Sequence, residues 1–457
     1  MKSFWDLMRD SMVATGASIV IFSVGLVMLI LVTAVPTGNP YIGLFTFIYL
    51  PVLVVIGGLV FFFGVIFNRP DKRRISRRLG LKKWLTAYFS PDFTKPAQRR
   101  RLTFFLVAGG LEIVVFSIGG LRLAQFMDTP QFCASCHTVM DPEYTVYQAS
   151  PHARVPCVSC HIGPGAPWLV RSKITGIRQV WHTMTKTFDR PVPTPIEHLR
   201  PARETCEQCH WPQKFSGNIS RTFRRYNADE KNSEQSTTLL LKVGSGEPTV
   251  AQGIHWHIAA GVWYVPVDER RQNIGWVGVD TGNNQFKEYI DPKAVPDITA
   301  EKIRSDKRLM DCIDCHNRAT HIFRSPGELM DIAFSRGNMA VNLPFLKEQG
   351  LKALVPVNTS EQSAIDKVES ISEFYKTKYP QIYADQRQAI EKSLLHLKDI
   401  VRLTTFPYMR VNWETHPDNL GHTKTPGCMR CHGKLVSKAE GKPLDASCTL
   451  CHDFAAR

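Results

Sequence analysis

The sequence predicts three transmembrane α-helices followed by a mostly α-helical and irregular outer domain with a small β-rich insert. Three apolar stretches are each long enough to cross a bilayer. A strongly basic segment separates the second stretch from the third. The remaining chain holds six Cys-x-x-Cys-His units in a background rich in Pro and Gly with little hydrophobic periodicity. The predicted domains are a membrane domain at 1–126, a domain with three Cys-x-x-Cys-His units at 127–234, a β-rich insert at 235–300 and a C-terminal region with the other three units at 301–457.

The predicted membrane domain has spans at about 15–35, 41–67 and 102–126. The five residues between the first two spans, Pro36 to Pro40, are uncharged, so these spans are expected to form a helical hairpin. The first span is too long for a cleaved signal peptide and lacks a clear small-residue cleavage site. We therefore expect it to be retained in the mature chain.

The loop at 68–101 sets the expected orientation. Twelve Lys or Arg lie between Arg69 and Arg101, and a basic loop next to short spans stays on the cytoplasmic side. The chain after Phe126 is then expected outside the cytoplasm, which predicts a multi-pass protein of a bacterial inner membrane with a periplasmic outer domain. From residue 102 onward there are 42 basic and 37 acidic residues, so the net charge of +15 does not indicate a nucleic-acid partner.

All twelve cysteines belong to the six Cys-x-x-Cys-His units, and none is left for a disulfide. Two thiols at this spacing can form thioethers to one haem, and the following His then lies beneath the iron. Zinc sites also use paired cysteines but do not need a His directly after the second one. The predicted attachment residues are Cys133, Cys136, Cys157, Cys160, Cys206, Cys209, Cys312, Cys315, Cys428, Cys431, Cys448 and Cys451, and the proximal ligands are His137, His161, His210, His316, His432 and His452. This predicts six haem c groups, which agrees with an outer domain because haem is attached outside the cytoplasm.

Nine further histidines could supply the second axial ligands. His/His ligation gives the low potentials that suit quinol or anaerobic chemistry. The preferred distal candidates are His152, His182, His257, His321 and His422, and the other candidates are His255, His416, His396, His198 and Met140. His255 and His257 flank Trp256 in what reads as a strand, so their side chains are expected to point the same way.

Two inserts between the haem motifs carry a secondary-structure signal. Residues 235–290 read as β-rich, with candidate strands at Thr237 to Val243, Val262 to Val267 and Trp276 to Asp280. Residues 360–402 read as helical because their apolar positions recur at helical spacing.

The first haem motifs and their surroundings resemble the NapC/NirT quinol dehydrogenases. The match is carried by Cys133 to Met140, Tyr144, Tyr147, His152, the motif Cys157 to His161, the helix-like segment Lys173 to His182 and the motif at Cys206. It covers about residues 102–215. The later sequence resembles a longer multihaem subgroup that includes inner-membrane cytochromes of metal-reducing bacteria.

The resemblance implies that the first haem lies at the membrane surface and takes electrons from menaquinol or ubiquinol. Met140 stands three residues after His137, whereas the family has its ligating Met two residues after this His. The family also has an acidic residue beside this haem, and Arg178 and Gln179 stand in the corresponding region of this sequence. Lys173 is a candidate for holding a quinol oxygen. Glu112, an ionisable residue inside the third predicted span, Asp141 and Glu143 are candidate proton acceptors.

The expected function is electron transfer from quinol through six haems to a periplasmic cytochrome or complex subunit. One alternative is a non-catalytic electron-wire subunit of a larger respiratory or photosynthetic complex. A terminal reductase of a small oxyanion is a further alternative, which requires a haem with an open axial position.

Overall fold

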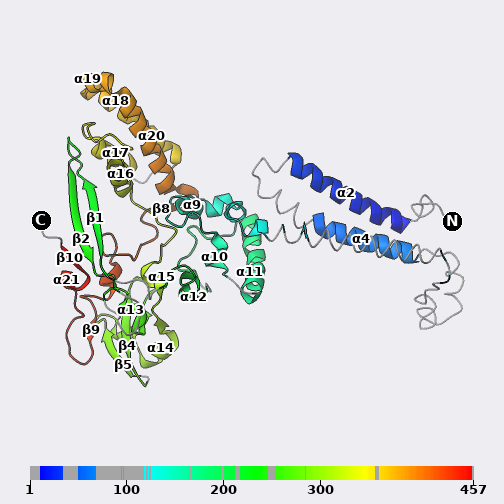
Figure 1. Cartoon of the computed structure of the whole chain (residues 1–457), viewed down its shortest axis with the longest axis horizontal. Coiled ribbons are helices and arrows are strands. Elements are labelled where there is room, and N and C mark those ends of the chain that lie inside the picture. The colour runs from blue at the N-terminus through cyan, green and yellow to red at the C-terminus, as the bar shows by residue number, and fades with distance from the viewer. Residues whose placement is uncertain are drawn as a thin grey trace. The chain divides into compact units, whose positions relative to one another are not determined.

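The computed structural model describes residues 11–33, 50–67, 94, 96, 118–119, 122, 125–163, 166–196, 200–211, 217–244, 253–283, 285–355 and 360–454 (Figure 1). The chain forms two compact units, Met1–His137 and Thr138–Arg457. The predicted domain boundaries at 127, 235 and 301 stay predictions.

The first unit contains a pair of packed helices, α2 (Ser11–Thr33) and α4 (Leu50–Phe67). Gly16 permits the close approach, because a Cβ at this position would overlap the backbone of Phe61. The unit ends with the short helix α8 (Pro130–Ala134), whose first turn is capped by the Thr129 hydroxyl accepting from the Phe132 N–H at 3.2 Å.

The predicted fold class with three transmembrane helices is wrong for the part of the chain that the structure describes. Among the described residues, no helix is long and apolar enough to cross a membrane. Helices α2 and α4 fall on the first two predicted spans. Almost all of the third predicted span and of the basic loop at 68–101 lies outside the described residues.

The second unit places its helical turns at the Cys-x-x-Cys-His motifs. The turns are α10 (Cys157–His161), α12 (Ala202–Cys206), α15 (Cys312–Cys315), η6 (Gly427–Arg430) and α21 (Cys448–Cys451). Two longer helices, α9 (His137–Gln148) and α11 (Ala166–Thr185), flank the second motif.

Three antiparallel sheets connect these turns. The first has the order β1 (Ile219–Tyr226), β2 (Glu234–Leu241) and β10 (His452–Phe454). The second has the order β6 (Arg308–Leu309), β3 (Val262–Pro266), β4 (Ile274–Gly282), β5 (Gln285–Ile290) and β9 (Val436–Ser437). The third pairs β7 (Thr405–Phe406) with β8 (Val411–Asn412). Strands β9 and β10 come from the C-terminal motifs, so the sheets join the two ends of the second unit.

A helical module without any Cys-x-x-Cys-His motif holds the largest apolar core. Its helices are α16 (Pro326–Ser335), α17 (Leu346–Leu354), α18 (Glu361–Lys378), α19 (Pro380–Asp385) and α20 (Arg387–Thr404). Met330, Leu346, Tyr375 and Leu397 are fully buried in it. The segment read as helical at 360–402 is thus three helices, because Pro380 cannot continue the hydrogen bonding of α18.

Four short helical pieces complete the second unit. Helix α14 (Ala300–Asp306) follows the 3₁₀ turn η4 (Val295–Asp297), and the 3₁₀ turn η5 (Pro407–Met409) stands between β7 and β8. A further one-turn helix, α13 (Trp256–Ala259), precedes β3 and carries His257.

Candidate haem-binding site

Each motif in the second unit presents its cysteines from one turn of helix. The two cysteines stand three residues apart, which places them on the same side of a turn. The turn α15 is also capped at its N-terminus by two reciprocal hydrogen bonds. Asp311 accepts from the Cys312 N–H at 2.7 Å, and Asp314 accepts from the Asp311 N–H at 2.8 Å. This capping box holds Cys312 and Cys315 in place with the protein's own hydrogen bonds.

Four motif histidines each face a second histidine from elsewhere in the chain. The ring centres are 6.0 Å apart for His152 and His210 and 6.2 Å apart for His161 and His321. They are 5.8 Å apart for His257 and His432 and 6.4 Å apart for His422 and His452. Two metal–nitrogen bonds of about 2 Å, plus about 1 Å from each nitrogen to its ring centre, give about 6 Å across one metal ion. The four pairs therefore have the spacing of two axial ligands of one haem iron.

His255 lies in the neighbourhood of the fourth motif. Burial lowers the pKa of His255, and the charge of His316 is the next cause. Four motif histidines of the second unit thus face a second histidine ring, and His316 has His255 within electrostatic range. The side chain of His137, in the first motif, lies outside the described residues.

Backbone carbonyls hold several of these rings by Nδ1. The Nδ1 atoms of His152, His321 and His257 lie 3.1, 3.0 and 2.8 Å from the carbonyl oxygens of Ala319, Glu143 and Ile254. The His432 Nδ1 lies 2.5 Å from the Asp445 carbonyl oxygen. An Nδ1–H that donates to a carbonyl leaves Nε2 unprotonated, which is the form that binds a metal.

Burial disfavours the charged form of several of these imidazoles. It lowers the pKa of His161, His257 and His316, and it lowers the pKa of His321 to about 4. A neutral imidazole has a lone pair for a metal. The environment of these four rings thus suits metal ligation.

Consecutive motifs lie next to each other along the second unit. Cys206 lies within electrostatic range of the Cys160 thiol and helps to raise its pKa. Cys206 and Cys312 share a side-chain hydrogen bond that lowers the pKa of Cys206. Cys315 lies within electrostatic range of Cys428, and Cys428 lies within range of Cys451. The attachment points of the second to sixth motifs therefore follow one another in chain order.

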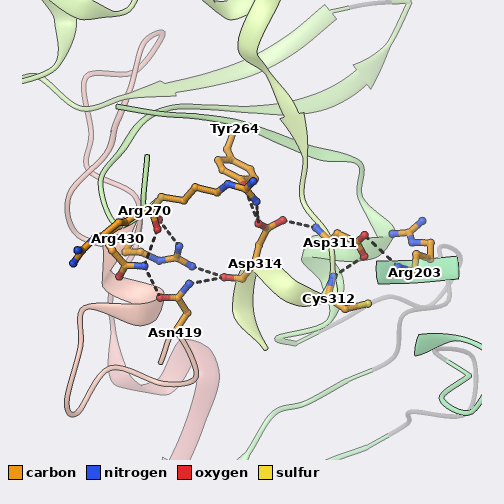
Figure 2. Close-up of polar contacts among 10 residues, drawn as sticks. Arg203, Tyr264, Arg270, Asp311, Cys312, Asp314, Asn419 and Arg430 are labelled. Atoms are coloured by element: carbon orange, nitrogen blue, oxygen red, sulfur yellow. Dashed lines mark hydrogen bonds and ion pairs between the residues drawn. The ribbon is translucent and has the colours of Figure 1, made fainter. Parts of the chain in front are cut away.

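A buried polar network supports the fourth motif (Figure 2). The Tyr264 hydroxyl donates to the Asp314 carboxylate at 2.6 Å, while Arg430 and Asn419 donate to the Asp314 carbonyl oxygen at 2.6 and 3.1 Å. Burial raises the pKa of Asp314. Arg430 belongs to the fifth motif, so this network fixes the fourth and fifth motifs against each other. The spacing Asp311-x-x-Asp314 is a capping-box signal that sequence reasoning missed, whereas nothing local in the sequence points to Tyr264 or Asn419.

The structure pairs four of the five preferred distal candidates with motif histidines. The fifth, His182, instead has Nδ1 2.8 Å from the Thr187 hydroxyl and accepts from the Arg178 Nε at 3.4 Å. His416 is buried against Phe323, and burial lowers its pKa to about 3. His396 lies 4.0 Å from Asp399 on α20. His198 lies outside the described residues, and Met140 is half-buried on α9.

The expected strand around Trp256 is wrong. His255 has helical backbone angles and Trp256 begins the helix α13. Residues two positions apart in a helical turn point in different directions. Accordingly, His257 faces His432 whereas His255 approaches His316. One short segment therefore lies near the histidines of two consecutive motifs.

The quinol-site candidates are placed only in part. Asp141 is exposed on α9 and accepts from the Thr145 hydroxyl at 3.4 Å, while burial raises the pKa of Glu143. Gln179 is exposed on α11. Lys173 lies on the same helix, but its side chain and all of Glu112 are outside the described residues. No hydrogen bond or ion pair joins Asp141 or Glu143 to Gln179 in the part of the chain that the structure describes.

Comparison with known proteins places the chain in a family. The model of the NapC/NirT cytochrome c family, N-terminal region, matches residues 95–201. The cytochrome c-type protein ImcH of Geobacter sulfurreducens is 37% identical over 446 residues, which cover 96% of this chain and 86% of ImcH. The chain belongs to the NapC/NirT cytochrome c family. Other NapC/NirT proteins match over shorter regions.

The cytochrome c-type protein TorC of Escherichia coli K12 is 27% identical over 119 residues, 22% of this chain and 30% of TorC. The denitrification system component NirT of Stutzerimonas stutzeri is 22% identical over 167 residues, 33% of this chain and 83% of NirT. No solved structure matches. Membership of the NapC/NirT family implies covalently bound haem c and a function in electron transfer. The resemblance recognised from the first motifs is thereby confirmed.

Proposed function

We propose that the chain transfers electrons from a membrane quinol, with menaquinol as the expected donor, through six c-type haems to a periplasmic redox partner. The observation that carries the proposal is the set of histidine pairs, each joining a motif histidine to a distant one at the separation of two axial ligands. The order in which the motif cysteines adjoin one another supports a relay rather than isolated centres.

The residues that would hold the haems follow from the pairs. Each motif would contribute its two cysteines as thioether links and its histidine as one axial ligand. The second ligands would be His321, His152, His255, His257 and His422 for the second to sixth motifs in that order. A c-type haem ligated by two histidines supplies a low-potential one-electron iron couple.

The protein's own groups would tune that couple in two ways. Carbonyl oxygens of Ala319, Glu143, Ile254 and Asp445 hold the imidazoles by Nδ1 and so keep Nε2 directed at the iron position. Burial disfavours extra positive charge at these sites, as the lowered histidine pKa values indicate. A carbonyl acceptor behind the ring makes the imidazole a better donor, which favours the oxidised iron and lowers the potential.

Helix α11 supports a quinol site at the start of the relay. Its exposed apolar residues Ile174, Ile177, Trp181 and Met184 recur at helical spacing and form one stripe. Lys173 and Gln179 of this helix are the quinol-site candidates. An apolar stripe with Trp is suited to the boundary of a bilayer, from which quinol arrives. Asp141, Glu143 and Glu112 are the candidate proton acceptors.

Two bound histidines per haem argue against the terminal-reductase alternative. A reductase of a small oxyanion needs an open axial position on one haem. In the second unit each motif histidine has a second imidazole within reach, so the first motif would be the place for such a position. Nitrite binding by the purified chain would favour the reductase.

The proposal is tested by adding a menaquinol analogue anaerobically to the detergent-purified full chain while haem absorbance is followed. Reduction of the haems in the absence of another protein is the expected result. Failure of the quinol to reduce them, although dithionite does, would leave only the electron-wire alternative. The mass of the mature polypeptide should also exceed that of the sequence by six haems, and protease added to right-side-out vesicles should reach the segment after Phe126.

A further inference from the structure

The three-stranded sheet β1-β2-β10 has two faces of different character. Side chains at 219, 221, 223 and 225 of β1 point to one side, and those at 220, 222, 224 and 226 point to the other. The first side carries Ile219, Arg221, Phe223 and Arg225, and cross-strand pairing adds Phe454 of β10 to it. We refer to these five residues as the Arg221 face.

The charged residues on the opposite face of the sheet form ion pairs. Arg224 lies 3.5 Å from Glu234, and Lys242, at the end of β2, lies 3.1 Å from Asp453. These ion pairs leave little net charge on that face.

The Arg221 face combines positive charge with exposed apolar surface. Its β2 positions, Gln235, Thr237, Leu239 and Leu241, include no carboxylate. Arg221 lies over the Phe223 ring at 5.3 Å, and Arg225 has no ion-pair partner among the described residues. Ile219 is 53% exposed and Phe454 is 62% exposed. Exposed apolar side chains beside uncompensated arginines are typical of an interface with a partner protein.

The strand register connects this face to the last haem motif. Across the three strands, His452 is in register with Leu241 of β2 and Ile219 of β1. Phe454 is likewise in register with Leu239 of β2 and Arg221 of β1. Residues directly opposite in an antiparallel sheet share a face. The motif histidine and the Arg221 face are thus on one side of one small sheet, and Figure 1 shows the β1–β2 hairpin beside β10 and α21.

We propose that the Arg221 face is the docking surface for an electron-accepting protein with an acidic patch around its own redox centre. This inference rests on the proposed function, because it takes the motif at Cys448 as the end of the relay. The arginines would steer a negatively charged partner, and Ile219, Phe223 and Phe454 would exclude water once it has docked. Contact with this sheet would bring the partner's redox centre to the side on which His452 lies.

The test compares residues of one strand that point to opposite faces. Arg221→Glu and Arg225→Glu, singly and together, change the proposed surface, and Arg224→Glu on the paired face is the control that makes the same charge change as either single variant. The full chain is reduced with dithionite, so the measurement does not depend on quinol oxidation. It is then mixed in a stopped-flow instrument with an oxidised acidic soluble cytochrome c or, separately, with a basic one.

At low ionic strength, Arg221→Glu and Arg225→Glu should each react with the acidic cytochrome about threefold more slowly than wild type, and the double variant about tenfold more slowly. The deficit should shrink at high salt, where surface charges are screened. Arg224→Glu should lower the rate less than about twofold, and the basic cytochrome should react faster with the double variant than with wild type. Reoxidation by the small neutral oxidant benzoquinone should stay unchanged in all variants, which shows that their haems are intact.

Equal slowing by Arg224→Glu would overturn the proposal, because net charge alone would then explain the effect. No slowing by the double variant would overturn it as well. A wild-type dimer in sedimentation that Arg221→Glu dissociates would assign the face to a second copy of this chain instead. Failure of quinol to reduce the chain would refute the proposed quinol oxidation but leave this rate comparison intact.

Discussion

At the scale of single residues, the histidine pairs divide the non-motif histidines into two groups. His152, His255, His257, His321 and His422 each approach a motif histidine, while His182 and His396 have other polar partners. Both groups include half-buried rings, so burial alone does not separate them. The separation comes from long-range placement, as for His321, which lies 160 positions from its partner His161.

Replacing His321 with Ala should leave one iron with a single protein ligand. We expect a high-spin ferric EPR signal corresponding to about one haem in six, and a higher potential for that haem. His396→Ala is the control, because His396 is a half-buried histidine that lies beside its helix neighbour Asp399 and faces no motif histidine among the described residues. A low-spin spectrum unchanged by His321→Ala would remove His321 from the ligand set.

The sequence could identify these residues individually but could not pair them. The Cys-x-x-Cys-His spacing marks each attachment site because its chemistry is local. His152 and His422 stand a few residues before the motifs at Cys157 and Cys428, yet they face His210 and His452 of the next motifs. Proximity in sequence therefore misleads here, because a short turn directs the ring away from its own motif and towards the following one.

At the scale of elements, one glycine shapes the turn that precedes the fifth motif. Gly427 has a φ of 47°, and a Cβ at this position would overlap the carbonyl oxygen of Gly421. The Cys428 N–H donates to that same carbonyl at 3.0 Å. The bend thus places Cys428 directly, and only glycine fits it.

Gly427→Ala should therefore impair haem attachment at Cys428 and Cys431. The expected result is a mature polypeptide with one haem fewer by mass, or a sharply reduced yield. Gly337→Ala is the matched control, since Gly337 has a φ of 69° but open space around its Cβ position. Equal haem loss in both variants would show that backbone strain in general, rather than crowding at Gly421, is responsible.

A buried ion pair joins α16 and α17 beneath the β1–β2 hairpin. The Lys347 Nζ lies 2.5 Å from the Asp331 Oδ1, and the same carboxylate oxygen accepts from the Tyr226 N–H at 2.9 Å. Lys347 is 4% exposed, and burial lowers its pKa. The pair is therefore well shielded from water, and each partner depends on the other for its charge balance.

Lys347→Met should destabilise the second unit by about 3 kcal/mol, because it leaves the Asp331 carboxylate buried without a cation. Lys352→Met is the control, since Lys352 pairs with Glu348 on the exposed side of the same helix and should cost less than about 1 kcal/mol. Urea unfolding followed by circular dichroism measures both. If the double variant Lys347→Met/Asp331→Leu recovers most of the lost stability, the loss is due to the unpaired Asp331 carboxylate. Equal losses of stability in Lys347→Met and Lys352→Met would contradict the argument.

The elements themselves were only partly predictable. The periodicity at 360–402 indicated helix, and Pro380 marks where the helix is interrupted. Strand β1 escaped prediction because its arginines and exposed positions lack the alternation of a half-buried strand. The turn at α13 was predicted as a strand because His-Trp-His alternates with a period of two. The segment is too short for this pattern to distinguish a strand from a helical turn.

At the scale of the whole molecule, the second unit combines a helical core without any Cys-x-x-Cys-His motif with a series of motif turns. The helical module and the sheets bury aliphatic and aromatic residues in the usual way, whereas the motif histidines lie outside the largest apolar cluster. Sequence patterns indicated the number and order of the motifs. They could not show that the motifs adjoin one another in chain order, because that depends on sheets formed between segments about two hundred residues apart, such as β2 and β10.

The order of the motifs makes the fourth one a bottleneck, since its cysteines adjoin the third motif on one side and the fifth on the other. His255→Met should raise the potential at this position, because a thioether ligand favours the reduced iron. Electrons would then reach the fourth motif and leave it slowly.

With the menaquinol analogue as donor and an acidic soluble cytochrome c as acceptor, we expect steady-state turnover to fall by about tenfold, which corresponds to about 59 mV for a one-electron couple. The extent of reduction by quinol without an acceptor should stay complete. The same substitution at His396, a half-buried histidine on α20 beside Asp399, should leave turnover unchanged. If His255→Met raised the potential of one haem without slowing turnover, electrons would have a route that bypasses the fourth motif, and the linear relay would be wrong.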